Sequence, residues 1–520
     1  MNINLMSAIN QTLNNEFNVS ITENGAVGYR TTGKELLDLN FAVASLRKMS
    51  DAEIARRFKK AFYEDMFLAI KWLFYARDVR EGLGERRLFR VVLADLVQTN
   101  PEMVIPVISL IPEYGRFDDL WCLLDNPHSA PIVYQIVDAQ LRQDLENMFA
   151  NKPISLLAKW MPSINASSTK TKEYGKKLCK ALRMSERDYR KTLSKLRSYL
   201  DVVEVKMSEK NWSEIKYEAV PSRANLIYNK AFLRNDEERR RDFLGKLEKG
   251  ETKINASTLF PHDIVNKYSH YSYNKDAAIE ALWKALPDTV NGCGNTIVVA
   301  DGSDSMGTRV DVNSSVTALD VANALAIYFA EHSSGQFKDK YITFSERPQI
   351  VDFSNCDSLY DKLRKAWAYS EVANTNIEKV FDLILASAVV NHMTQEDLPV
   401  NILIISDMEF DSCATCGEAT RDRWGYYRSA AQPSQRLFEV IAQRYAKYGY
   451  KMPRLVFWNV ASRTGTIPVK ENDLGVALVS GFSVNVAKMV MSGKTDPFEC
   501  LLETLNSERY DPIEDALRAQ

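Results

Sequence analysis

The chain has 520 residues, which is long enough for more than one domain and for a large core. Its 66 Lys and Arg residues almost balance its 68 Asp and Glu residues, so the net charge of −2 does not by itself indicate a polyanionic partner. No run of eighteen apolar residues occurs, so we expect no membrane-spanning helix. Seven mostly scattered cysteines are typical of reduced thiols, so we expect a cytoplasmic protein.

The first half of the chain is predicted to be helical. Residues 1–34 form an N-terminal segment that we expect to be extended, and residues 35–290 show helical periodicity almost throughout. Connections are short and carry helix-stopping residues such as Gly82 and Pro101. Successive helix pairs favour a HEAT-like helical repeat, either a solenoid or a closed ring. The predicted helices include Ala52 to Phe62, Tyr63 to Ala76, Glu85 to Gln98, Met103 to Ile111 and Pro131 to Phe149.

A basic stretch lies within this helical region. Residues 170–210 hold thirteen Lys and Arg residues against six acids, a local net charge of +7. Tyr189, Leu193 and Leu196 recur at helical spacing and are predicted to pack inward. The cations predicted on the outer face are Arg187, Arg190, Lys191, Lys195 and Arg197. Such a face can neutralise phosphates of a nucleic acid, but a solvated helix exterior explains the same pattern.

Residues 291–520 alternate between strands and helices, which predicts a doubly wound, mostly parallel sheet. The predicted strands are Thr296–Asp301, Lys340–Phe344, Gln349–Phe353, Asn401–Asp407, Leu455–Val460 and Val476–Ser480. The predicted helices are near Val316–Glu331, Ser358–Trp367, Ile377–Val390, Gln435–Tyr448 and Phe498–Asn506. We therefore expect a multidomain protein in which an all-α region precedes an α/β domain.

Polar side chains follow two of these strands at the point where each strand ends. Asp301, Ser303 and Ser305 come directly after one buried strand, and Asp407 follows another. Because parallel strands end at the same edge of a sheet, we expect these side chains and the loop residue Thr375 to lie there together. Carboxylate and hydroxyl oxygens suit Mg²⁺ or Mn²⁺. In the alternative interpretation, Asp301 and Ser303 only cap the helix that follows.

The order Asp-x-Ser-x-Ser, then Thr, then Asp resembles the metal-ion-dependent adhesion site (MIDAS) of the von Willebrand factor A domain. By this resemblance Ser303 and Ser305 bind the ion directly. Thr375, Asp301 and Asp407 then complete its coordination directly or through water.

Several further stretches resemble a family of functionally uncharacterised proteins that couple a helical domain to a von Willebrand A-like domain. These stretches include residues 77–86, 111–120, 220–224, 259–262, 457–460 and 480–483. The resemblance spans roughly residues 21–506, and the family is distantly similar to the TROVE proteins, whose founding member is the Ro ribonucleoprotein autoantigen. The similarity to the Ro protein implies a helical platform that binds small structured RNAs and the ends of misfolded RNAs.

Three classes of function follow. The first is a noncatalytic RNA-binding protein of Ro-like architecture, which we expect. The second is a metal-dependent scaffold for protein–protein interaction, in which a carboxylate of an acidic partner completes the coordination of the ion. The third is an Mg²⁺-dependent enzyme such as a nuclease, for which the sequence offers neither a second-metal cluster nor a clear base. We therefore expect no catalytic residues.

Overall fold

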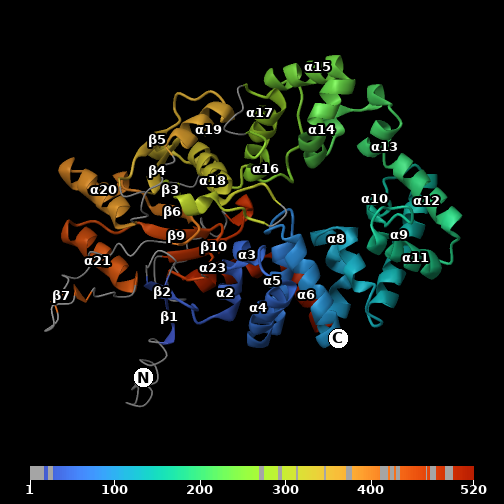
Figure 1. Cartoon of the computed structure of the whole chain (residues 1–520), viewed down its shortest axis with the longest axis horizontal. Coiled ribbons are helices and arrows are strands. Elements are labelled where there is room, and N and C mark those ends of the chain that lie inside the picture. The colour runs from blue at the N-terminus through green and yellow to red at the C-terminus, as the bar shows by residue number, and fades with distance from the viewer. Residues whose placement is uncertain are drawn as a thin grey trace, which may run out of the picture. The chain divides into compact units, whose positions relative to one another are not determined.

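The structure is a computed structural model, and its chain forms two compact units that are not continuous in sequence (Figure 1). Unit 1 comprises residues 1–50, 260–275 and 288–504, and unit 2 comprises residues 51–259, 276–287 and 505–520. The structure describes residues 17–21, 27–268, 274–290, 295–311, 314–344, 347–369, 377–409, 420–421, 427–428, 434–463, 465–468, 476–486 and 496–519.

Unit 1 contains a six-stranded sheet with the strand order β10-β9-β6-β3-β4-β5. All neighbours are parallel except β5, which pairs antiparallel with β4 at one edge. The strands are β3 Thr296–Asp301, β4 Lys340–Phe344, β5 Ile350–Asp352, β6 Asn401–Ser406, β9 Arg454–Asn459 and β10 Val476–Ser480. From β3 the chain continues to β4 on one side and later returns to β6 on the other, so the strand order reverses at β3. Ligands bind at this point in open α/β sheets.

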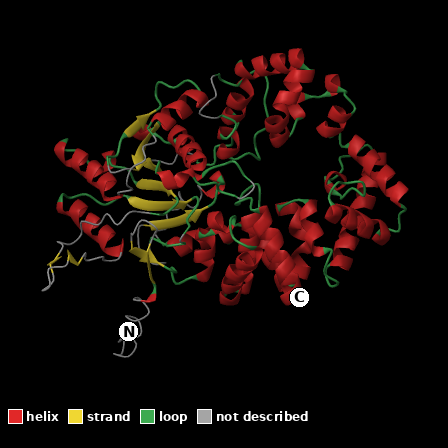
Figure 2. Cartoon of the chain, viewed as in Figure 1, coloured by secondary structure: helices red, strands yellow, loops and turns green. Residues whose placement is uncertain are grey.

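Helices cover both faces of this sheet, as predicted for an α/β domain (Figures 1 and 2). The long helix α18 packs on β3, β4 and β6, and α20 packs on β4 and on α21. Every residue of β3 and β6 is buried, because both strands lie in the middle of the sheet and are covered on both faces. The helices of unit 1 are α2 Glu35–Phe41, α3 Val43–Leu46, α16 Pro261–Val265, α18 Ala318–His332, α19 Leu359–Ala368, α20 Ile377–Val390, α21 Ser434–Lys447 and α23 Pro497–Leu505.

The N-terminal segment joins unit 1, and so do the first helices that we expected in the helical region. Strands β1 (Val19–Ile21) and β2 (Val27–Tyr29) form an antiparallel pair, and Tyr29 exchanges two backbone hydrogen bonds of 2.8 Å with Ile467. Helix α2 packs on β10 through a largely apolar buried face. The Asn459 side chain also donates to the carbonyl of Phe41 at 2.9 Å. Residues 35–50 therefore belong to unit 1, because their buried apolar face packs against the sheet.

Unit 2 is helical in all of its described elements, which confirms the predicted helical region. Its helices are α4 Asp51–Glu64, α5 Met66–Arg77, α6 Arg86–Thr99, α7 Pro101–Val104, α8 Ile111–Tyr114, α9 Ala130–Phe149, α10 Leu157–Trp160, α11 Thr169–Ala181, α12 Glu186–Tyr199, α13 Val203–Ser208, α14 Ser222–Asn235, α15 Glu237–Glu248, α17 Ala277–Lys284 and α24 Asp511–Arg518. Among the described residues no helix is both long and apolar enough to cross a bilayer.

The single helix predicted from Met103 to Ile111 is broken into three pieces. Helix α7 ends at Val104, a 3-10 helix covers Ile105–Leu110, and α8 begins at Ile111. Pro106 and Pro112 stand at the starts of the second and third pieces. Proline lacks the N–H of an α-helical hydrogen bond and its ring collides with the preceding turn, so a continuous helix is disfavoured here.

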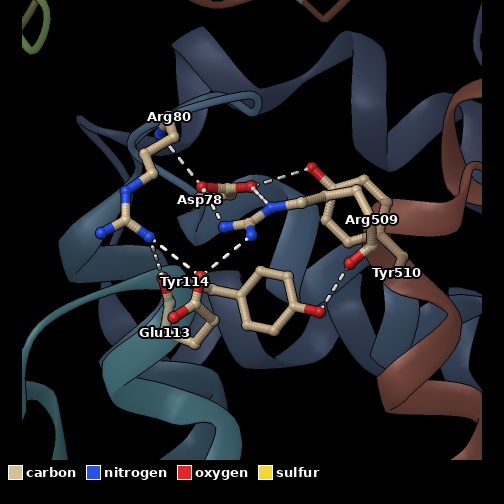
Figure 3. A network of polar contacts seen from close by, with 6 residues as sticks. All are labelled: Asp78, Arg80, Glu113, Tyr114, Arg509 and Tyr510. Carbon is tan, nitrogen blue, oxygen red and sulfur yellow. Dashed lines mark hydrogen bonds and ion pairs between the residues drawn. The ribbon is translucent and has the colours of Figure 1, made fainter.

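The last described segment of the chain packs in unit 2, although we expected all residues after 291 in the α/β domain. Figure 3 shows Arg509 and Tyr510 beside Asp78, which is fully buried. The Arg509 Nε donates to Asp78 Oδ2 at 2.9 Å, and the Tyr510 hydroxyl donates to the same oxygen at 3.3 Å. The Tyr114 hydroxyl in turn donates to the carbonyl of Arg509 at 2.6 Å. Helix α24 continues this contact by packing on α5.

Candidate functional site

Asp301 is the last residue of β3, and its carboxylate is buried at the carboxyl edge of the sheet. Its Oδ1 accepts a hydrogen bond of 2.9 Å from the backbone N–H of Ser303, in the turn after the strand. Its Oδ2 accepts a hydrogen bond of 2.7 Å from the hydroxyl of Ser406, the last residue of β6. The carboxylate is therefore held from two strands, because β3 and β6 are parallel neighbours that end side by side.

Asp407 follows β6 and is also buried. Its Oδ1 accepts a 3.2 Å hydrogen bond from the backbone N–H of Glu409. Between them Met408 has a φ of 63°, a left-handed conformation that residues other than glycine rarely adopt. The other carboxylate oxygen, Oδ2, makes no hydrogen bond within the described part of the chain. A strained turn thus presents a buried carboxylate, one oxygen of which has no hydrogen-bond donor among the described residues.

The hydroxyls of Ser303 and Ser305 lie next to these carboxylates. Their Oγ atoms are 2.9 Å apart, and the Ser305 hydroxyl interacts with the carboxylate of Asp407. Ser303 precedes a 3-10 helix, Asp304–Gly307, but its side chain makes no capping hydrogen bond to that helix. The capping interpretation therefore does not account for the Ser303 hydroxyl. The structure brings together four of the five residues expected at the ion, whereas Thr375 lies outside the described residues.

The two carboxylates destabilise each other when both are ionised. Burial is the main cause that raises the pKa of Asp301, and the charge of Asp407 raises it further. Burial also raises the pKa of Asp407, followed among the raising causes by the charge of Glu409. The hydrogen bonds that Asp301 accepts from Ser303 and Ser406, and the one that Asp407 accepts from the Glu409 backbone, offset these effects only in part. A cation at this edge of the sheet would favour the ionised form of both carboxylates.

The chemistry of this donor set fits Mg²⁺ or Mn²⁺. Both ions prefer carboxylate, hydroxyl and water oxygens, and these are the groups that Asp301, Ser303, Ser305 and Asp407 supply. In the described residues no cluster of three or more His, Cys, Asp or Glu side chains is suited to a metal ion. An ion held here would therefore depend on the two serine hydroxyls and on water beside its two carboxylates.

Two cations beside this site were not singled out from the sequence. The Arg463 Nη2 lies 3.8 Å from Asp407 Oδ2, and its backbone N–H donates to the buried carboxylate of Glu409 at 2.8 Å. Lys48 lies near enough to both Arg463 and Asp407 for their charges to affect its pKa, which burial lowers. Arg463 follows β9, the next parallel strand, so strand order alone would have placed it at the same edge. Lys48 carries no such signal, because it follows helix α3, a part of unit 1 that is distant in sequence from the strands of the sheet.

The basic stretch of unit 2 folds into α11 and α12, where most of its cations are exposed. Buried Tyr189, Leu193 and Leu196 form the inner side of α12, as predicted. We use the term basic face for the four exposed cations of this helix, which are Arg187, Arg190, Lys191 and Lys195. Helix α11 adds the exposed side chains of Lys172, Lys176 and Lys180.

Arg197 differs from the other expected cations of this face. Its guanidinium donates to the carbonyls of Ala158 at 2.8 Å and Met161 at 2.9 Å, and the side chain is half-buried. Burial lowers the pKa of Arg197. These contacts join α12 to the end of α10, so we assign Arg197 a structural role.

Comparisons with known proteins find two family models, one for the N-terminal and one for the C-terminal part of the chain. Residues 295–513 match the family model described as "Domain of unknown function (DUF7788)". Residues 22–113 and 166–298 match a second model, "Domain of unknown function (DUF2828)". The chain is also similar to an uncharacterized protein of Acanthamoeba polyphaga mimivirus, with 28% identity over an alignment that covers 95% of this chain and 89% of the relative. The similarity thus extends through both the helical and the α/β regions.

Proposed function

We propose that this protein is a noncatalytic RNA-binding protein whose helical unit contacts RNA through the basic face of α12. The observation that carries this proposal is the exposure of four cations along one helix. Among the described residues, none of the four forms an ion pair with an acidic side chain. By contrast, Lys170 and Lys177 of α11 are both neutralised by Asp125, at 2.6 and 2.7 Å.

The proposal also assigns a fold type to each of the two units. We interpret unit 2 as a HEAT-like platform similar to that of the TROVE proteins, and unit 1 as a von Willebrand factor A-like domain. Consecutive helix contacts, such as those of α4 with α5 and of α14 with α15, support the first interpretation. The reversal of strand order at β3, with Asp301 and Asp407 at the ends of β3 and β6, supports the second. The expected ligand is a small structured RNA or the end of a misfolded one.

Fluorescence anisotropy of a labelled RNA hairpin with a single-stranded tail tests the proposal. Each phosphate contact releases condensed counterions, so affinity falls as salt rises. Arg187→Glu with Lys191→Glu should weaken binding and should flatten the slope of log K against log salt by roughly 0.7–0.9 for each lost contact. We expect this because the two side chains are exposed and lie one helical turn apart.

A matched control is the charge reversal of Lys230 and Arg234, which are equally spaced and exposed on α14. This pair should leave both the affinity and the salt slope close to those of the parent protein. Equal losses from the α12 and α14 pairs would show that only overall charge matters. No loss from the α12 pair would remove the basic face from the RNA-binding surface.

A second candidate is a metal-dependent scaffold that binds an acidic protein partner. It is favoured by the buried Asp407 Oδ2, which accepts no hydrogen bond from any described residue, and by the position of Arg463 and Lys48 beside it. In such a complex Asp301, Ser303, Ser305 and Asp407 would hold Mg²⁺ or Mn²⁺, and the ion would bind a carboxylate of the partner. The two cations would then favour an anionic partner.

Calorimetric titration with MgCl₂ and MnCl₂ tests the ion site itself. Asp301→Asn should abolish binding, since it removes one of two carboxylates while it keeps the size of the side chain. Asp304→Asn is the matched control, because Asp304 is an exposed acid in the same turn. Equal affinities of the parent protein and Asp301→Asn would refute the site. RNA binding that survives Asp301→Asn in the presence of a chelator would favour the first function over the second.

A further inference from the structure

Helix α12 carries an ordered row of side chains that leads from cations to aromatic rings. Arg187, Lys191, Lys195 and Tyr199 follow each other at intervals of four residues, so they lie along one side of the helix. At a rise of 1.5 Å per residue, the row is about 18 Å long. Positive charge is thus presented along a line, with an aromatic side chain at its end.

A second aromatic ring lies at the same end of this row. Phe149 is the last residue of α9. This residue is 71% exposed, whereas the apolar residues on the inner side of α9 are buried. The Nζ of Lys195 lies 4.5 Å from the centroid of the Phe149 ring, which is a cation–π contact. Tyr199 donates from its hydroxyl to the carbonyl of Lys152 at 2.9 Å, three residues beyond Phe149. Phe149 therefore adjoins the basic face and not the hydrophobic core.

We propose that Phe149 stacks on an unpaired base of single-stranded RNA whose phosphates contact Arg187, Lys191 and Lys195. This inference rests on the proposed function and adds the kind of RNA that the basic face accepts. Exposed aromatic rings beside a line of cations bind single strands, because every base offers a flat face for stacking while the cations neutralise the backbone. A paired base in a duplex is already stacked and cannot reach the ring. When a base covers Phe149, the flexible Lys195 side chain leaves the ring and contacts a phosphate.

Two labelled probes test this inference with the full chain, a single-stranded oligoribonucleotide and a blunt RNA duplex of the same length. Phe149→Ala should weaken binding of the single strand by roughly 5- to 150-fold, which corresponds to the loss of one stacked base. Its salt slope should stay unchanged, since no phosphate contact is removed. Binding of the duplex should also stay unchanged. Phe149→Trp should keep the affinity for the single strand, whereas Phe149→Leu should lose it.

Leu156→Ala is the matched control, because Leu156 is a nearby exposed apolar side chain, 53% exposed, that has no ring. Full affinity in Phe149→Leu, or equal losses for the two probes in Phe149→Ala, would overturn the stacking role. If Arg187→Glu with Lys191→Glu weakens RNA binding and Phe149→Ala does not, this inference fails while the proposed function stands. If the parent protein binds neither probe, both fail. Circular dichroism melting of each variant separates these outcomes from loss of fold.

Discussion

Asp119 is the centre of a buried ionic network in the helical unit, and its removal should strongly destabilise that unit. The side chain of Asp119 is 0% exposed. Its Oδ2 accepts hydrogen bonds from Arg77 Nε at 2.8 Å and Arg77 Nη2 at 2.7 Å, and the Arg77 side chain is itself 1% exposed. The same oxygen accepts the backbone N–H of Arg116 at 2.9 Å. Oδ1 accepts from Arg90 at 2.6 Å. Asp119→Ala would leave the Arg77 guanidinium buried without its counterion.

The expected loss is about 3–5 kcal/mol of unfolding free energy, the usual cost of an uncompensated buried charge. We assign most of this loss to Arg77, since Arg90 is partly exposed and keeps an ion pair of 2.7 Å with Asp118. For a unit of this size each kcal/mol lowers the melting temperature by roughly 2–4 °C. Thermal melting followed by circular dichroism should therefore show a decrease of about 6–20 °C.

Two further variants make this prediction refutable. Asp118→Ala should cost less than about 1 kcal/mol, because the ion pair that this carboxylate forms within the described part of the chain is with the partly exposed Arg90. Arg77→Met combined with Asp119→Leu should recover a large part of the stability, since a buried ion pair and an apolar pair of similar size are close in energy. If Asp119→Ala costs no more than Asp118→Ala, or if the double variant is the least stable of all, the assignment to Arg77 is wrong.

Two other predictions concern pH. Because the pKa values of Asp301 and Asp407 are raised in the folded state, the folded protein holds more protons than the unfolded chain above about pH 4. In the presence of a chelator, the melting temperature of the α/β unit should fall as the pH rises from about 4 toward neutrality. Addition of Mg²⁺ should restore the melting temperature. A melting temperature that does not change with pH would contradict this prediction. Conversely, the pKa of Glu514 is lowered by Lys71, which is 2% exposed. The stability that this ion pair contributes should be lost as the pH falls below about 4. Glu514→Gln should lower the unfolding free energy by roughly 1–3 kcal/mol, as measured by urea unfolding at pH 7.

Much of the α/β unit was predictable from local sequence. The predicted bounds of β3, β4 and β10 agree with the structure, as do those of α20. These strands are short apolar runs bounded by turn residues, and both faces of each are covered, so the hydrophobic run and the strand coincide. The positions of Asp301 and Asp407 followed from parallel pairing alone.

What could not be predicted depends on contacts between distant parts of the chain. Residues 35–50 look like any amphipathic helical segment, and their contacts with β9 and β10 determine where they pack. The role of Ser406 follows from a hydrogen bond to Asp301 across 105 residues. Similarly, Arg197 has the spacing of a surface cation, but the carbonyls of the buried residues Ala158 and Met161 at the end of α10 accept its guanidinium. Helical periodicity cannot identify such partners, because it describes one helix at a time.

The contact of Arg509 and Tyr510 with Asp78 has a consequence for the order of events on the ribosome. The paired residues are 431 positions apart, so translation at 5–20 residues per second makes the last partner about 20–90 s after Asp78. Throughout that interval the nascent helices lack the segment that covers α5, while the whole sheet is being synthesised. We therefore expect the helical unit to be a chaperone client until the segment from residue 505 onward has been synthesised, and termination before residue 505 should yield an aggregation-prone product even though the other helices of unit 2 are present.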